Sequence, residues 1–170
     1  MPVFHSIEDV SNHVSKDKQC YLLYTDGSCK AKTGQGGWGW ILKKQYGTHL
    51  ETIDKGCGGA VDTTISRMEM TAILMGLLAF IEGKYTGELY VISDSQFIVN
   101  SFNKGWFKRW KETEFLGRPN ADLWSIFSDT LSLMHPFHFI HTRGHEKGME
   151  YHKEGNTEVD ALCSYKNFLQ

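Results

Sequence analysis

The sequence predicts an α/β domain with a mixed β-sheet, and two observations carry this prediction. The first third of the chain contains three apolar segments that are typical of consecutive strands, and the last two alternate apolar and polar residues as a hairpin does. The rest of the chain alternates strands with amphipathic helices, a pattern that is typical of parallel strands joined by helical crossovers. Both kinds of strand pairing are therefore expected in one sheet.

The composition is that of a globular protein. The chain has 170 residues, of which 41% are hydrophobic and 22% are charged. This length is most simply one domain, and the composition excludes a collagen-like or strongly disordered chain. No apolar run reaches the ~20 residues that a membrane-spanning helix needs, and the first residues show no signal peptide.

Charge and cysteines constrain the partners and the compartment. The formal net charge is −2, so a nucleic-acid partner would have to be held by a local basic patch. No Cys-x-x-Cys pair occurs, which argues against a zinc site or a disulfide framework. Free thiols and a cytoplasmic location are expected for the four cysteines, Cys20, Cys29, Cys57 and Cys163.

The first strand is predicted at residues 21–25, and it ends on Asp26, which the turn residue Gly27 follows. A charged side chain is rarely buried unless it is paired or binds a metal, so Asp26 is predicted to anchor a metal site. A basic, glycine-rich loop is predicted at 30–37. The hairpin strands are predicted at 38–44 and 49–55, and the glycines at 56–59 are expected to interrupt the pattern.

The clearest helix signal spans residues 63–81 and stops at Gly83. Its predicted apolar stripe consists of Met68, Ala72, Met75, Leu78 and Ala79. The later elements are predicted as a strand at 88–93, helices at 95–102, 104–111 and 121–133, a strand at 136–141, a loop at 142–156 and a helix at 157–169. Residues 1–19 are predicted to be an extension with a short helix, and residues 20–170 to be the domain proper.

Two further carboxylates lie where a ligand site is expected. Asp94 ends the second apolar strand as Asp26 ends the first, and ligands of α/β sheets bind beyond the carboxyl ends of strands. Glu69 lies in the first turns of the long helix, beside its apolar stripe. Each has a simpler explanation, because an aspartate can cap a turn or helix and an acid is favoured near a helix N-terminus.

The ordered motifs carry a resemblance to a known family. Their order and spacing, from about Cys20 to the end of the chain, resemble type 1 ribonuclease H (the ribonuclease HI family). The motifs are Thr25-Asp-Gly-Ser28, Arg67-Met-Glu69, Asp94-Ser-Gln96, Arg143-Gly-His145 and Asn156-x-x-x-Asp160.

The resemblance implies a fold, a reaction and a set of catalytic residues. The implied fold is a mixed five-stranded sheet with helices on both faces. The implied enzyme is an endonuclease that hydrolyses the RNA strand of RNA–DNA hybrids and leaves 3′-hydroxyl and 5′-phosphate ends. The implied catalytic groups are a histidine, His145, and four metal-binding carboxylates, Asp26, Glu69, Asp94 and Asp160.

Elementary chemistry agrees with a carboxylate site. Two divalent cations about 3.5–4 Å apart can stabilise both the attacking and the leaving oxygen of a phosphodiester. Mg²⁺ prefers carboxylate oxygen and water, so two Mg²⁺ ions are expected, with Mn²⁺ as a substitute. An imidazole titrates near neutral pH, so His145 suits proton transfer or product release, although a surface histidine without a role is the simpler alternative. His138 and His141 are predicted to face solvent.

The resemblance also implies a surface for the hybrid duplex. Residues 104–111 contain four basic residues and no acid, and they match a basic protrusion that grips the DNA strand. Core tryptophans under a solvated basic face are the alternative. Ile65 departs from the family, which commonly has an asparagine there. The implied substrate-binding residues are Ser28, Cys29, Thr64, Ser66, Gln96, Lys104, Trp106, Lys108, Arg109, Trp110 and Asn120.

Three other functions match parts of the sequence. Residues 34–39 match the dinucleotide fingerprint G-x-G-x-x-G, but a strand follows where the fingerprint requires a helix, so a dehydrogenase is rejected. A resolvase- or transposase-like DNA nuclease and a catalytically silent hybrid-binding module remain as alternatives. The motif order disfavours the first, and the complete set of carboxylates disfavours the second. We expect a monomer that binds an RNA–DNA hybrid and no membrane.

Overall fold

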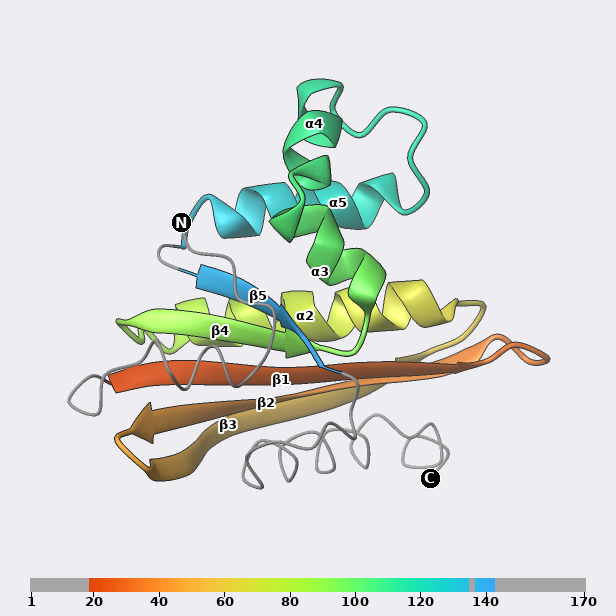
Figure 1. The fold of residues 1–170 in the computed structure, drawn as a ribbon. Coiled ribbons are helices and arrows are strands. Elements are labelled where there is room, and N and C mark those ends of the chain that lie inside the picture. The colour runs from red at the N-terminus through yellow and green to blue at the C-terminus, as the bar shows by residue number, and fades with distance from the viewer. Residues whose placement is uncertain (1–18, 135–136, 143–170) are drawn as a thin grey trace.

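A computed structural model describes residues 19–134 and 137–142 of the chain. Five described strands form one sheet in the order β3-β2-β1-β4-β5 (Figure 1). β1 pairs antiparallel with β2 and parallel with β4, so the predicted mixed sheet is confirmed. The strands are β1 Gln19–Lys30, β2 Gln35–Tyr46, β3 His49–Ala60, β4 Glu88–Ser93 and β5 Phe137–His141.

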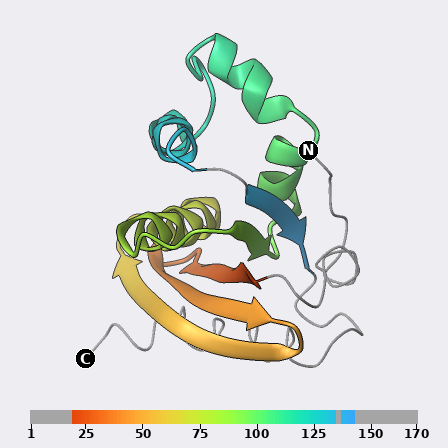
Figure 2. The ribbon, with the colours of Figure 1, turned by 90° about the vertical axis from the view of Figure 1, so that its left-hand side faces the viewer.

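Four described helices accompany the sheet, namely α2 Ile65–Glu82, α3 Gln96–Asn103, α4 Trp106–Glu112 and α5 Ala121–Leu131. α2 begins at Thr64, whose side chain accepts a hydrogen bond from the Arg67 amide, and it ends at Gly83 as predicted. α2 lies along the sheet, and α4 lies farthest from it (Figures 1 and 2). None of the described helices is long and apolar enough to cross a membrane.

Both faces of the sheet are buried. The larger core lies between the sheet, α2, α3 and α5, and includes Leu23 of β1, Leu77 of α2 and Trp124 of α5. A second core on the opposite face includes Leu22 of β1 and Tyr90 of β4. Successive residues of β1 therefore point to opposite faces, which explains why its sequence is a continuous apolar run.

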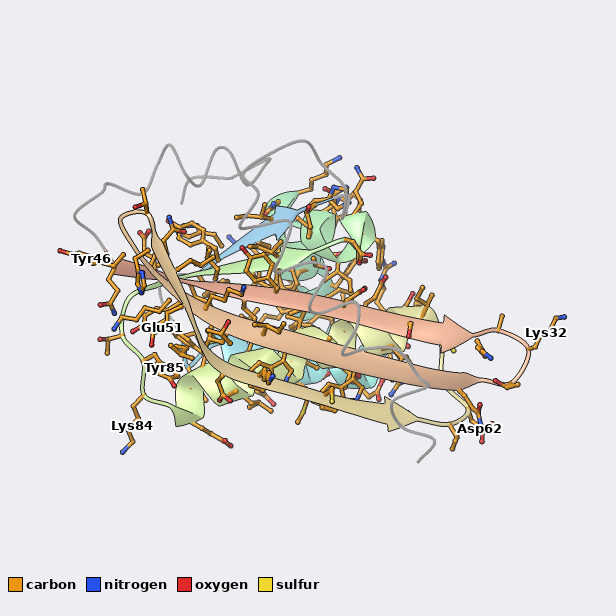
Figure 3. The ribbon with its side chains drawn as sticks, turned by 90° about the horizontal axis from the view of Figure 1, so that it is seen from below. Lys32, Tyr46, Glu51, Asp62, Lys84 and Tyr85 are labelled. Atoms are coloured by element: carbon orange, nitrogen blue, oxygen red, sulfur yellow. The ribbon has the colours of Figure 1, made fainter. Side chains whose placement is uncertain are left out.

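The prediction that Asp26 ends the first strand is wrong. β1 continues to Lys30 because its pairing with β2 runs on to Lys30↔Gln35. The parallel pairing with β4, in contrast, stops at Tyr24↔Ile92. Asp26 thus lies inside β1, just beyond the point where β4 leaves it. The predicted loop at 30–37 contracts to a turn at 31–34, with Lys32 at its tip (Figure 3).

The prediction that glycines interrupt the third strand is also wrong, because β3 runs through them to Ala60. Indole rings from β2 lie over these glycines. A Cβ added at Gly58 would lie 2.3 Å from the Trp38 ring, and one added at Gly56 would lie 2.7 Å from the Trp40 ring. The rings cover the bare backbone of β3, so the glycines serve the pairing of the two strands.

The apolar stripe of α2 is rotated from the predicted one. Met75 and Leu78 are 39% and 37% exposed, whereas Ile73 and Leu77 are fully buried. The reason is the approach of the helix to β1 at Gly76, where an added Cβ would lie 2.7 Å from the side chain of Leu23. The face of α2 around Gly76 comes closest to the sheet. The positions of the large apolar residues alone do not reveal this face.

His138 does not face solvent as predicted, since it is 6% exposed. It pairs with Tyr90 in the parallel register of β4 and β5, and its ring stacks on the Tyr90 ring at 4.9 Å. Its Nε2 lies 4.0 Å from a carboxylate oxygen of Glu88. Because this face of the sheet is buried, alternation of histidine with phenylalanine on β5 does not mark a solvated side. His141 is half-buried.

Several predictions concern residues outside the described ranges. These are the short helix in the N-terminal extension, most of the loop after Thr142 and the C-terminal helix. His145, Asp160 and Cys163 also lie outside the described residues.

Candidate active site

The ends of two parallel strands bring Asp26 and Asp94 to the same level of the sheet. The last parallel pair is Tyr24↔Ile92, and each aspartate lies two residues beyond it. Thr25 holds the strands together at this point, since its hydroxyl donates to the Ile92 carbonyl at 3.1 Å. The Gly27 amide donates to a carboxylate oxygen of Asp26 at 2.9 Å. Both carboxylates therefore come from a rigid part of the fold.

Gly27 lets α2 approach β1 beside Asp26. A Cβ at this position would lie 2.4 Å from the amide nitrogen of Glu69 and 2.4 Å from the carbonyl carbon of Met68. Both are backbone atoms, so no side-chain rotation could relieve the overlap. Only glycine permits this contact, and the contact places the backbone of Glu69 against the strand that carries Asp26.

Glu69 shares its surroundings with Asp94. The pKa of Glu69 is raised to about 7, mainly by burial and in addition by the negative charge of Asp94. A hydrogen bond from the Ser95 hydroxyl acts against this shift. The same hydroxyl accepts the Ile98 amide at 3.3 Å as the N-cap of α3. The predicted proximity of helix and strand carboxylates thus exists in the fold.

These carboxylates provide the type of donor atom that a hard divalent cation prefers. The donors are oxygen atoms, and the mutual repulsion of Glu69 and Asp94 is the electrostatic strain that a bound cation relieves. Within the described ranges, no three His, Cys, Asp or Glu side chains gather closely enough to hold a metal. Asp26 belongs by alternation with Leu22 and Tyr24 to the face of the sheet opposite α2. The described residues therefore supply part of a ligand set.

The raised pKa of Glu69 predicts a pH-dependent stability of the metal-free protein. A carboxyl whose pKa is higher in the folded state stabilises the fold fully below its unfolded value of 4.5, and this contribution is lost as the pH rises through about 7. In a chelator, the melting temperature should therefore fall between pH 5 and pH 8 more steeply than in Glu69→Gln, which cannot titrate. Parallel pH profiles of the two proteins would refute this.

The proposed phosphate-binding residues gather where α2 and α5 begin. Arg67 of α2 donates to the Asn120 side-chain oxygen at 3.2 Å, and it forms two hydrogen bonds with Asp122 at 3.0 and 2.8 Å. The Arg67 amide donates to the Thr64 hydroxyl at 3.2 Å. Arg67 thus ties together Thr64 and Asn120, which lie far apart in the sequence. Ser66 is half-buried beside them.

Ser28 and Cys29 lie in the part of β1 that extends beyond Asp26. Both are half-buried, and the Cys29 thiol donates to the Thr63 carbonyl at 3.4 Å. This contact places the end of β1 beside the start of α2. Gln96 is exposed as the first residue of α3, directly after Asp94 and Ser95.

The basic segment is helical as predicted and forms α4. Trp106 and Trp110 are both half-buried, with ring centroids 6.3 Å apart. Trp110 packs edge-on against Trp124, which is 2% exposed, at 5.3 Å. Trp110 therefore packs against the core in part, and both tryptophans of α4 keep some exposed surface. Lys104 lies 5.8 Å from the Trp106 ring, and the remaining cations of the segment, Lys108, Arg109 and Lys111, are exposed.

Sequence reasoning missed three side chains of this surface. Phe97 is 51% exposed and lies 6.3 Å from Trp106 and 6.1 Å from Trp110 by ring centroids. Arg118 lies on the Trp110 ring, and Arg67 makes the links described above. Phe97 directly follows the motif Asp94-Ser-Gln96, and Arg67 belongs to the motif Arg67-Met-Glu69, so both offered a usable signal. For Arg118 the sequence offered none, because it lies beyond the basic segment.

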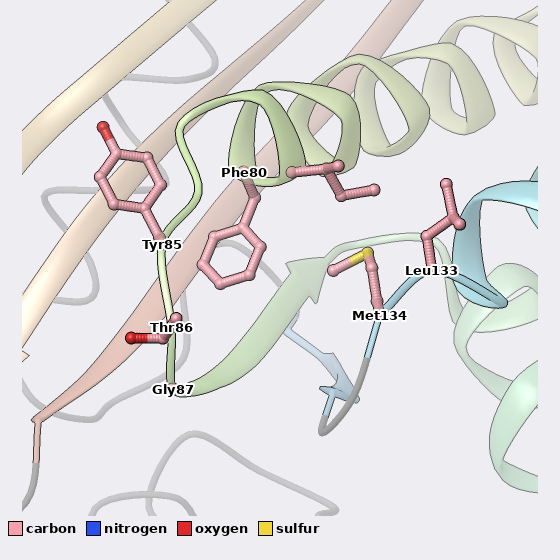
Figure 4. Close-up of a pocket in the computed structure, with 7 residues that line it drawn as sticks. Phe80, Tyr85, Thr86, Gly87, Leu133 and Met134 are labelled. Atoms are coloured by element: carbon pink, nitrogen blue, oxygen red, sulfur yellow. The ribbon is translucent and has the colours of Figure 1, made fainter.

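A cavity of about 230 Å³ lies at the other end of α2 (Figure 4). Phe80, Leu133 and Met134 are among the residues that line it. Phe80 and Glu69 are eleven residues apart on one helix, which corresponds to about 16 Å along the helix axis. This cavity is therefore separate from the carboxylates.

The comparison with known families shows to which family the chain belongs. The family model for RNase H matches residues 17–167, which is most of the chain. The chain belongs to the ribonuclease H family. Among ribonuclease H relatives, that of Syntrophus aciditrophicus is 37% identical over 134 residues, which cover 76% of this chain and 72% of the relative. That of Dechloromonas aromatica is 36% identical over 146 residues, covering 84% and 89%. Membership in this family supports an endoribonuclease activity for the chain.

Solved ribonuclease H structures share the fold. The ribonuclease H domain of prototype foamy virus has a TM-score of 0.73 at 22% identity, over 88% of this chain and 94% of that domain. RNase H1 of Halobacterium salinarum has a TM-score of 0.63 at 17% identity, over 85% and 94% of the two chains. LC11-RNase H1, solved in complex with an RNA/DNA hybrid, has a TM-score of 0.64 at 19% identity, over 88% and 99%. These similarities establish the ribonuclease H fold.

Proposed function

We propose that this protein hydrolyses the RNA strand of RNA–DNA hybrids and leaves 3′-hydroxyl and 5′-phosphate ends. The observation that carries the proposal is the convergence of β1, β4 and α2, which brings Glu69 beside Asp94 and against the strand of Asp26. Family membership supports the same conclusion, and a neighbour of the same fold is described in complex with an RNA/DNA hybrid.

The proposal includes two Mg²⁺ ions per site, with Mn²⁺ as a substitute. The residues that would hold them are Asp26, Glu69 and Asp94, with Asp160 as a fourth ligand. When bound, the ions stabilise negative charge on the attacking and leaving oxygens of the phosphodiester. The support is the oxygen-only donor set and the unfavourable proximity of Glu69 and Asp94, which a divalent cation would convert into a binding site.

The chain's own residues fix the geometry of this site. Ser95 donates to the carboxylate of Glu69, and Ile98 holds the Ser95 hydroxyl in turn, so the orientation of Glu69 is set by α3. The hydrogen bond between Thr25 and Ile92 keeps Asp26 and Asp94 at one level. His145 is proposed to move a proton or to assist product release, since an imidazole is the side chain whose ordinary titration lies near neutral pH.

The hybrid is proposed to bind across two surfaces. Thr64 and Asn120, joined through Arg67, would hold a DNA phosphate, and the exposed cations and rings of α4 would hold the DNA backbone further along. The RNA strand would lie near the carboxylates, where hydrogen bonds to its 2′-hydroxyls distinguish RNA from DNA. Ser28, Cys29, Ser66 and Gln96 are the proposed contacts there. Ile65, which is 54% exposed, offers no hydrogen bond to the hybrid.

Free thiols support the cytoplasmic location that the sequence predicts. Within the described ranges, Cys20, Cys29 and Cys57 are free. A monomeric state remains a prediction.

One assay tests the proposed function. Labelled RNA–DNA hybrid, RNA–RNA and DNA–DNA duplexes are incubated with the protein in millimolar Mg²⁺ or in chelator, and Asp94→Asn serves as the inactive variant. We expect cleavage only of the RNA strand in the hybrid, only with Mg²⁺, and none by Asp94→Asn. Cleavage of the DNA duplex would favour a resolvase-like nuclease, and tight hybrid binding without cleavage would favour a silent binding module.

Mg²⁺ is expected to raise the melting temperature of the protein, because an ion that binds only the folded state stabilises it. At a hundredfold excess over the dissociation constant, the free energy of unfolding should increase by about 2.7 kcal/mol per site. Thermal melting in chelator and in millimolar Mg²⁺ measures this shift. The double variant Glu69→Gln/Asp94→Asn is the control and should lose most of it. Equal melting temperatures of the wild type in both buffers would contradict the metal assignment.

A further inference from the structure

The loop between α4 and α5, residues 113–120, has a strongly constrained backbone. Three of its non-glycine residues have positive φ, namely Glu114 at 54°, Phe115 at 60° and Asn120 at 59°. Such values are uncommon for residues with a side chain, and a bulky aromatic residue is a marked exception. Backbone strain of this kind persists only where the surroundings enforce it, and it is common at ligand-binding segments.

Phe115 is the anchor that enforces this loop conformation. Its side chain is 3% exposed, and its ring lies 5.4 Å from the Phe107 ring. Its amide donates to the Trp110 carbonyl at 2.9 Å, and its carbonyl accepts the Arg118 amide at 3.1 Å. The loop is thus fastened to α4 on one side and to the core on the other, and the position of Arg118 follows from these contacts.

The side chain of Arg118 lies on the face of Trp110. Its guanidinium carbon is 3.9 Å from the centroid of the ring, which is a close cation–π contact. Trp110 is itself held by its edge-on contact with the buried Trp124 at 5.3 Å. A guanidinium that stacks through its flat face keeps its N–H groups at the rim, where they match the oxygens of a phosphate.

The charge of Arg118 is not neutralised within residues 19–134 and 137–142, where the structure gives this guanidinium a ring contact and no carboxylate partner. Arg67 is the opposite case, since Asp122 occupies its guanidinium with two hydrogen bonds. Arg118 also stands between two proposed contact points. Trp110 lies beneath it, and Asn120 is two residues away, at most about 7 Å along an extended chain.

From these contacts we propose that Arg118 binds a phosphate of the DNA strand and determines part of the affinity for the hybrid, with Trp110 as the platform that positions it. The inference rests on the proposed function, because it adds a residue to the same substrate surface. It assigns the loop 113–120 a role as a preorganised connection between the phosphate site at Asn120 and the basic surface of α4. Because no side chain has to be ordered on binding, the contact loses little conformational entropy.

The test measures hybrid binding as a function of salt in the Asp94→Asn background, so that the substrate stays intact. Arg118→Gln should weaken binding about tenfold or more, because it removes a charge-assisted hydrogen bond to the phosphate. It should also reduce the slope of log affinity against log salt by about 0.7–0.9, the contribution of one phosphate contact. Arg118→Lys keeps the charge and loses the flat stack, so its slope should equal that of Asp94→Asn while its affinity is lower.

A second substrate series identifies the strand. Single neutral methylphosphonates are placed along the DNA strand or the RNA strand. A methylphosphonate at one position of the DNA strand should weaken the binding of the hybrid by the Asp94→Asn parent. The same substitution should leave the binding by Arg118→Gln unchanged. Lys55→Gln on β3, an exposed charge on the edge strand far from α4, is the matched control and should keep the parent's slope.

The outcomes separate the two proposals. An unchanged salt slope in Arg118→Gln, or a sensitive phosphate in the RNA strand, overturns the assignment of Arg118 while hybrid binding itself stands. Failure of the parent to bind the hybrid overturns the proposed function and this inference with it. A merely structural role of Arg118 would lower the melting temperature of Arg118→Gln and leave both the slope and the methylphosphonate pattern as in the parent.

Discussion

Asp26→Asn is expected to lower the cleavage of RNA–DNA hybrids by roughly a thousandfold or more, because the loss of even one electrostatic donor from an active site lowers turnover by about 10²–10³-fold. Asparagine has nearly the shape of aspartate, so the fold and the binding of the hybrid should persist. The charge at this point of β1 is what the substitution removes. Single-turnover cleavage of a labelled hybrid, together with thermal melting, measures both expectations.

A matched control separates charge in general from charge at this site. Glu51 is an exposed carboxylate of β3, at the end of the antiparallel strands opposite the Lys32 turn (Figure 3). Glu51→Gln changes the net charge by the same amount and should cleave like the wild type. If Asp26→Asn retained more than a tenth of the wild-type rate, Asp26 would not be a ligand of the catalytic metals.

Gly27→Ala is expected to destabilise the protein by about 3 kcal/mol and to reduce hybrid cleavage at least a hundredfold. Overpacking typically lowers the free energy of unfolding by about 1–3 kcal/mol, and here the added methyl would meet backbone atoms of Met68 and Glu69 at 2.4 Å. Relief requires α2 to move away from β1, which separates Glu69 from Asp26. A displacement of about 1 Å in an active site can reduce the rate a hundredfold.

Gly76→Ala is the control for the same interface between α2 and β1. Its methyl would meet the far end of the Leu23 side chain at 2.7 Å, which can rotate, and alanine favours a helix over glycine by about 1 kcal/mol. Urea unfolding should therefore show a clearly smaller loss for Gly76→Ala. A midpoint for Gly27→Ala close to that of the wild type would mean that the tight contact at Gly27 does not constrain the helix.

The order of the elements was accessible from local patterns. β4 has the predicted limits, and α3 begins at Gln96, one residue after the predicted start at Ser95, because apolar runs and helix starts are local features. The length of β1 and β3 was not accessible. A strand extends as far as its partner pairs with it, and that partner lies elsewhere in the sequence.

The pKa of Glu69 and the burial of His138 also depend on partners that lie elsewhere in the sequence. The carboxylate of Glu69 was identified from its motif, but its raised pKa results from burial and from Asp94, which the fold brings beside it. The burial of His138 depends on its register with Tyr90 across two strands. The links of Arg67 to Asn120 and Asp122 join residues more than fifty positions apart. No local periodicity encodes such pairs.

The sequence by itself determined that this chain is a mixed α/β domain of the ribonuclease H family, because ordered motifs and apolar periodicity are properties of the chain alone. The tertiary structure decided how the site is built. The contact at Gly27 sets the distance between α2 and β1, burial and Asp94 raise the pKa of Glu69, and Trp110 sets the position of Arg118. Each of these depends on atoms that come together only when distant segments pack, and packing at that precision follows from the complete core.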